Sequence, residues 1–139
     1  MTLDIKICGL RNTEAIEACV TYGATHVGFI FFEKSPRHVI DMGLARDLAS
    51  FVDGRAKIVP VTVNADDAYL EDIVLAMAPD MLQLHGSESP ERVAELKARY
   101  NTPVMKAFAI RETGDFAKIH PYRGVADAFL FDAKAPPGA

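Results

Sequence analysis

Apolar residues along the chain alternate between two spacings. In short stretches they alternate with polar residues or run together, as in half-buried or fully buried β-strands. In longer stretches they recur every three or four positions, as on one face of an amphipathic helix. The strands predicted from this pattern are 5–8, 26–31, 57–63, 81–84, 104–108 and 128–131. The predicted helices are 13–22, 42–52, 65–77, 90–100 and, with a weaker pattern, 112–119.

Capping and breaking residues bound the predicted helices. Asn12 offers a cap for the first helix, and Ser89 precedes Pro90, which suits the first turn of the fourth. The helices end near breakers, namely Gly23, Gly54, Pro79 and Pro103. Strict alternation of strand and helix predicts parallel strands joined by right-handed crossovers.

Two architectures fit this alternation: a doubly wound open sheet, or part of an eight-stranded (β/α) barrel. The length favours the open sheet, because a barrel typically needs ~200 residues or more. The side-chain pattern favours the barrel, because an open sheet covered by helices on both faces is apolar on both. We assign these polar or thiol side chains to one face near the strand ends: Lys6, Cys8, Thr62, Asn64, Gln83, His85, Lys106 and Asp132.

Composition narrows the function classes. A net charge of −4, without any block of Lys and Arg, argues against nucleic acid or an anionic membrane as a partner. No apolar run reaches transmembrane length, and two cysteines are too few for a disulfide framework, so we expect a cytoplasmic protein. Cys19 falls on the apolar face of the first helix and is predicted to lie in the core. No His, Cys, Asp and Glu spacing is typical of a metal site.

Cys8 is the main candidate for chemistry. It ends the first predicted strand, directly before Gly9, where parallel α/β proteins bind their ligands. By itself, a cysteine in this place is more often a small buried apolar residue. The motifs elsewhere in the chain change that balance.

Five short motifs, taken in order, resemble the phosphoribosylanthranilate isomerases of tryptophan biosynthesis, which are (β/α)8 TIM barrels. They are Lys6-Ile7-Cys8-Gly9-Leu10, Gly28-Phe29-Ile30-Phe31 with Lys34-Ser35-Pro36-Arg37, Val61-Thr62-Val63-Asn64, Gln83-Leu84-His85-Gly86 and Phe131-Asp132-Ala133-Lys134. Each motif is only moderately specific, but the ordered set spans the whole chain.

The resemblance implies an Amadori rearrangement of N-(5-phosphoribosyl)anthranilate, an aminoaldose, to a 1-deoxyribulose 5-phosphate. Such a reaction needs an acid that protonates the ring oxygen and a base that removes the proton from C2. The resemblance makes Asp132 the general acid and Cys8 the general base. It implies a small phosphorylated substrate and no cofactor, because the nitrogen of the substrate serves as electron sink.

The resemblance also assigns substrate-binding residues. Arg37 is placed to capture the anthranilate carboxylate in a bidentate manner. Lys6 lies two residues before Cys8 and either favours the thiolate or forms an ion pair, for instance with Asp132. Asn64, Gln83 and His85 belong to matching motifs, although for Gln83 and His85 a supporting role through hydrogen bonds is favoured.

The chain is therefore expected to be one incomplete barrel domain, residues 1–139, that covers about the first five and a half βα units. In the family, loops after the seventh and eighth strands hold the substrate phosphate. Pro136-Pro137-Gly138 resembles the beginning of the glycine-rich loop that follows the sixth strand. We expect weak or no activity and self-association from the isolated chain, and a monomer or homodimer from the complete protein.

The alternative from another class is a doubly wound, receiver-like signalling module. Its length and element order fit the chain. A receiver domain needs acidic residues after its first strand to hold Mg²⁺, where this chain has Cys8-Gly9. A dinucleotide-binding module is less favoured, because no G-x-G-x-x-G follows the first strand.

Overall fold

The computed structural model of the protein describes residues 3–133, in which parallel strands form one sheet in the order β1-β2-β3-β4-β5-β6. The strands are β1 (Lys6–Ile7), β2 (His26–Phe31), β3 (Lys57–Thr62), β4 (Leu82–Leu84), β5 (Val104–Ile110) and β6 (Ala128–Ala133). The helices are α1 (Thr13–Thr21), α2 (Met42–Val52), α3 (Asp67–Met77), α4 (Pro90–Tyr100) and the 3₁₀ helix η1 (Thr113–Tyr122). Lys134 and the Pro136-Pro137-Gly138 segment lie outside the described residues.

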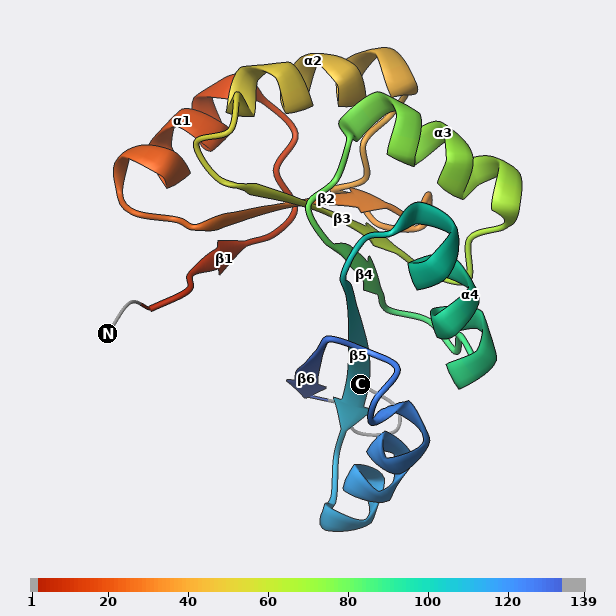
Figure 1. Ribbon diagram of the computed structural model, residues 1–139. Coiled ribbons are helices and arrows are strands. Elements are labelled where there is room, and N and C mark those ends of the chain that lie inside the picture. The colour runs from red at the N-terminus through yellow and green to blue at the C-terminus, as the bar shows by residue number, and fades with distance from the viewer. Residues whose placement is uncertain (1–2, 134–139) are drawn as a thin grey trace.

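The sheet curves into a half-barrel, and helices α1–α4 follow its outer side (Figure 1). Each strand lies beside its neighbours in sequence, so the strand order never reverses. A doubly wound sheet reverses its order at a switch point and carries helices on both faces. The doubly wound, receiver-like alternative is therefore wrong for this chain.

The apolar core lies between the sheet and the outer helices. Alternate residues of β2, among them Phe29 and Phe31, are buried against α1, α2 and α3. A second cluster joins β4 and β5 to α4 through Leu82, Leu84 and Leu96. As predicted, Cys19 packs against the first cluster, although it is only partly buried.

The helix starts follow the predicted caps. The side chain of Asn12 accepts a hydrogen bond from the Ala15 N–H at 2.8 Å, and Ser89 accepts one from the Arg92 N–H at 3.1 Å. The fifth helix differs from the prediction, since η1 is a 3₁₀ helix rather than an α-helix. Pro121 lies within it, and a proline disfavours a regular α-helix, because it has no N–H and its ring clashes with the preceding turn.

The strand register corrects the assignment of Thr62 and Lys106 to the face that carries Cys8. Thr62 pairs with Leu84, and Leu84 pairs with Lys106. Paired residues of parallel strands point to the same side, and Leu84 is buried under the helices. Thr62 and Lys106 therefore belong to the outer, helix-facing side of the sheet.

In the part of the chain that the structure describes, no helix has the length and apolar character that a membrane crossing requires.

Candidate active site

A pocket of about 340 Å³ opens on the inner side of the half-barrel. Its walls come from both edge strands of the sheet and from the strand ends between them. The lining residues are Lys6, Cys8, Ile30, Arg37, Val61, Gln83, His85, Leu130 and Asp132. Of the seven residues predicted from the sequence, the pocket brings together all except Asn64.

Cys8 and Lys6 approach each other over a glycine of β2. A Cβ atom at Gly28 would lie 3.0 Å from the Cys8 Sγ and 3.2 Å from the Lys6 Nζ. Only a residue without a side chain leaves room for both groups on this side of β2. The Gly28 carbonyl also accepts hydrogen bonds from the Gly9 and Leu10 N–H groups, at 3.0 and 3.2 Å, which holds the turn after β1.

The ion pair that was considered between Lys6 and Asp132 is not formed within residues 3–133. Asp132 pairs with His85 instead, and no carboxylate of these residues lies within 4.0 Å of the Lys6 Nζ. Lys6 therefore brings a positive charge to the Cys8 side of the pocket.

Arg37 packs over the turn that follows Cys8. Gly9 has a φ of +84°, and a Cβ atom there would lie 2.8 Å from the Arg37 Nη1. The loop that carries Arg37 is held by Arg11, whose Nη1 donates to the Pro36 carbonyl at 2.9 Å. The guanidinium thus reaches the pocket beside the thiol.

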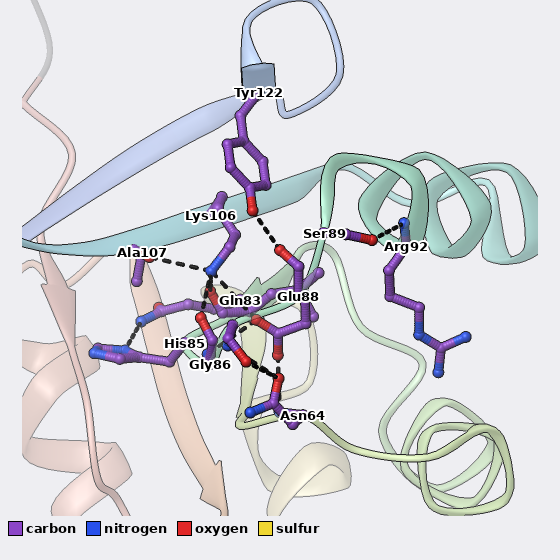
Figure 2. Close-up of polar contacts among 12 residues, drawn as sticks. Asn64, Gln83, His85, Gly86, Glu88, Ser89, Arg92, Lys106, Ala107 and Tyr122 are labelled. Carbon is purple, nitrogen blue, oxygen red and sulfur yellow. Dashed lines mark hydrogen bonds and ion pairs between the residues drawn. The ribbon is translucent and has the colours of Figure 1, made fainter. Parts of the chain in front are cut away.

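Gln83, His85 and Asp132 form a row of polar contacts along the opposite wall. The Gln83 Nε2 lies 3.3 Å from the His85 Nδ1, and the His85 Nε2 lies 3.3 Å from the Asp132 Oδ2. Gln83 is only 2% exposed, whereas the Asp132 side chain is 60% exposed. The row therefore runs from the buried strand β4 to the open edge of the pocket, and Figure 2 shows its first two members.

Asn64 lies apart from this pocket, in the turn after β3. Its φ of +50° is left-handed, and its Oδ1 accepts hydrogen bonds from the Ser87 N–H at 2.9 Å and the Ser87 Oγ at 3.3 Å. A Cβ atom at Gly86 would lie 2.7 Å from the Asn64 side chain, so the two turns are in close contact. In this structure Asn64 joins the turn after β3 to the loop after β4 (Figure 2).

A buried ion pair between Lys106 and Glu88 was not predicted from the sequence. The Lys106 Nζ donates to the Gly86 carbonyl at 2.7 Å, the Ala107 carbonyl at 3.2 Å and the Glu88 Oε1 at 3.2 Å. The two residues are 2% and 6% exposed. Figure 2 shows how the pair fixes the loop that follows His85.

Tyr122 closes this loop from the other side, because its hydroxyl donates to the Glu88 carbonyl at 2.5 Å. Burial raises the pKa of Tyr122, and the nearby Glu88 carboxylate adds to the effect. In the sequence, the sign of a buried cation was Lys106, the single lysine of the otherwise apolar strand β5. The sequence did not indicate which of its many acidic residues is the partner.

The arrangement allows acid and base chemistry on one small molecule. A thiol from the β1 edge and a carboxyl group from the β6 edge face the same pocket. A ligand between them could receive a proton on one side and lose one on the other. Within residues 3–133, no group of three or more His, Cys, Asp and Glu side chains is arranged to hold a metal ion.

Comparison with known proteins gives a consistent family. The family model described as N-(5'phosphoribosyl)anthranilate (PRA) isomerase matches residues 5–138. Over 139 residues, the chain is 62% identical to the N-(5'-phosphoribosyl)anthranilate isomerase of Brucella canis, with 100% of this chain and 62% of that protein covered. The chain thus spans 62% of the length of this relative.

Two solved structures are similar over nearly the whole chain. Phosphoribosyl anthranilate isomerase from Thermotoga maritima matches with a TM-score of 0.88 and 29% identity, covering 98% of this chain and 64% of that one. A phosphoribosyl anthranilate isomerase in complex with reduced 1-(o-carboxyphenylamino)-1-deoxyribulose 5-phosphate matches with a TM-score of 0.86 and 29% identity, covering 96% and 66%. Fold, motifs and family model agree, and the chain belongs to the N-(5'-phosphoribosyl)anthranilate isomerase family.

Proposed function

We propose that the protein catalyses the Amadori rearrangement of N-(5-phosphoribosyl)anthranilate to 1-(2-carboxyphenylamino)-1-deoxyribulose 5-phosphate, an aldose–ketose isomerisation of tryptophan biosynthesis. The observation that carries this proposal is that Cys8 and Asp132 line one pocket from the two edge strands. Membership of the isomerase family and the relative bound to a reduced product analogue support it.

In the proposed first step, Asp132 acts as the general acid. Its carboxyl group gives a proton to the furanose ring oxygen, and the bond between that oxygen and C1 breaks. The lone pair of the anthranilate nitrogen forms a C1–N double bond, which yields an iminium ion. The exposed position of Asp132 at the rim is compatible with contact to a ring oxygen.

In the second step, the Cys8 thiolate removes the proton from C2. The electron pair of the broken C–H bond forms a C1–C2 double bond, and the iminium electrons return to the nitrogen. The resulting enolamine gains a proton at C1 and loses one from the C2 hydroxyl, which yields the ketone. The neighbouring Lys6 ammonium supports the thiolate electrostatically.

The remaining predicted binding residues have separate proposed roles. Arg37 binds the anthranilate carboxylate, because its planar guanidinium lies beside the thiol and forms bidentate pairs with carboxylates. The substrate-binding role of Asn64 stays a prediction, and its contacts within the turn after β3 favour an indirect effect.

We also propose that residues 1–139 are one domain that supplies about the first five and a half βα units of a (β/α)8 barrel. The 64% coverage of the Thermotoga maritima chain supports this assignment. The phosphate group of the substrate would then be held by loops after the seventh and eighth strands, at the same end of the barrel. The complete protein is proposed to be a cytoplasmic monomer or homodimer, and a dimeric relative from Thermotoga maritima supports the second state.

The test follows the loss of anthranilate fluorescence from freshly made substrate. This chain is compared with a chimaera in which the remaining sequence of the Brucella canis relative is joined after Ala139. We expect turnover by the chimaera and weak or no turnover by the chain alone, since the phosphate loops are needed. A chimaera that shows native circular dichroism but no turnover, under conditions in which the Brucella canis protein is active, would contradict the proposed function.

A further inference from the structure

The row from Gln83 to Asp132 constrains where its protons lie. The Gln83 Nε2 is an amide nitrogen that only donates, and it lies 3.3 Å from the His85 Nδ1. With the amide in this orientation the Nδ1 accepts, which places the imidazole proton on the Nε2. That nitrogen lies 3.3 Å from the Asp132 Oδ2, so a proton on the Nε2 is directed to the side of the ring that the carboxyl group approaches.

The position of Gln83 limits how its amide can approach His85. Gln83 is 2% exposed, and its register with Val61 and Met105 fixes it within the centre of the sheet. Among the described residues its Oε1 has no hydrogen-bond partner, so the amide is held in place by packing and by His85 alone. Gln83 thus fills space in the sheet as an apolar residue would, and its Nε2 group is directed at His85.

We propose, on the basis of the proposed function, that His85 and Gln83 are positioning residues for the acid step. Gln83 orients His85 with its proton on the Nε2, and His85 in turn occupies the Oδ2 of Asp132. The transferable proton is then carried by the Oδ1, the oxygen left for the substrate. This specifies the supporting role through hydrogen bonds that the sequence favours for both residues over direct substrate binding.

In this proposal, a hydrogen bond from the His85 Nε2 to Asp132 also favours proton transfer. When Asp132 gives its proton to the ring oxygen, the carboxyl group becomes a carboxylate, and the Nε2–H bond to it becomes charge-assisted. The same bond is present but weaker while Asp132 is protonated. His85 thus stabilises the product of the proton transfer more than its starting state, which lowers the barrier. The other charged or titratable groups that face this pocket are Lys6, Cys8 and Arg37.

The tautomer is tested directly by ¹⁵N NMR of histidine side chains in this chain and in the chimaera. We expect the proton of the neutral imidazole of His85 on the Nε2, with a bare Nδ1. Gln83→Glu replaces the donor by an acceptor, and it should move the proton to the Nδ1. A protonated Nδ1 in the unsubstituted protein would overturn the inference without any activity measurement.

The positioning role is tested by kinetics of the chimaera. His85→Leu should lower kcat by roughly tenfold, the loss of one hydrogen bond to a charged group, with KM within about twofold. His85→Gln should restore most of the activity, because its amide Nε2–H can take the place of the imidazole donor. His120→Leu, at an exposed histidine of η1, is the matched control and should have no effect.

The pH profile separates positioning from a structural role. Without the His85 donor the carboxylate of the acid is less stabilised, so the high-pH limb of kcat should move to higher pH in His85→Leu. If His85→Leu lowers kcat by the same factor at every pH, without moving either limb of the pH profile, or does not lower kcat at all, the positioning role is overturned. If the unsubstituted chimaera shows no turnover, the proposed function and the role of His85 in it both fail, and the tautomer is still decided by NMR.

Discussion

Gly28 lies beneath the two groups that define the Cys8 side of the pocket. Its missing side chain leaves space that the Cys8 Sγ and the Lys6 Nζ both approach. A Cβ there would also come within 3.1 Å of the Cys8 Cα, which belongs to the backbone and moves less easily than a side chain. At the residue scale, a glycine that takes no part in the reaction thus determines how closely Cys8 and Lys6 can approach β2.

Gly28→Ala should therefore displace β1 and separate the thiol from the ammonium. We expect a loss of about 1–3 kcal/mol in the free energy of unfolding, typical of an overpacked site, measured by urea denaturation. Gly114→Ala is the matched control, because a Cβ at Gly114 meets no atom within 4 Å. Equal stability of the two variants would show that β2 does not constrain Cys8 in this way.

Much of the site could be predicted at the residue scale, because the residues concerned follow the ends of parallel strands. Cys8, His85 and Asp132 were brought together by this rule and by the family resemblance. The rule does not determine which face of each strand points inward. Lys106 was therefore placed on the wrong face, since only its register with Leu84 reveals that it points toward the helices.

At the scale of elements, the loop between β4 and α4 connects the core to the site. It carries His85 at its start and Glu88 near its end, and Lys106 of β5 holds it from beneath. The Gly86 and Asn64 N–H groups both donate to the Glu88 carboxylate at 2.9 Å. The loop is thus tied to two neighbouring strands through one buried carboxylate.

Removal of the cation from this pair should be costly. Lys106→Met leaves the Glu88 carboxylate buried without its ammonium, and we expect a loss of about 3–5 kcal/mol in chemical denaturation. The double variant Lys106→Met/Glu88→Gln should lose less than Lys106→Met alone, because the uncompensated charge is gone. Lys57→Met, at an exposed lysine of β3, serves as control and should change stability by less than about 0.5 kcal/mol. A double variant at least as unstable as Lys106→Met would contradict this account.

The sequence predicted the elements better than their contacts. The bounds of β2, α2 and α4 match the predictions, because strong caps or breakers flank each of them. The fifth helix was expected as an α-helix and is a 3₁₀ helix with Pro121 inside. The pairing of Lys106 with Glu88 depends on a loop conformation that no periodic pattern encodes.

At the scale of the whole molecule, the proposed base and acid belong to opposite edges of the sheet. Cys8 follows β1 and Asp132 lies in β6, and these strands are not neighbours in the sheet. The separation between the two groups is therefore set by the curvature of all six described strands. Any segment that bridges β6 to β1 would fix the separation between Cys8 and Asp132 more firmly. The kinetic measurements are therefore made on the chimaera, which contains such a segment.

The central claim is that the Cys8 thiol, and not merely the presence of a cysteine, removes the C2 proton. The most direct measurement compares kcat/KM of Cys8→Ala and Cys19→Ala in the chimaera. Cys19 lies in α1, packs against the core and does not line the pocket. We predict a loss of about 10³-fold for Cys8→Ala, as general base catalysis implies, and little change for Cys19→Ala. Unchanged activity in Cys8→Ala, or an equal loss in both variants, would contradict the account.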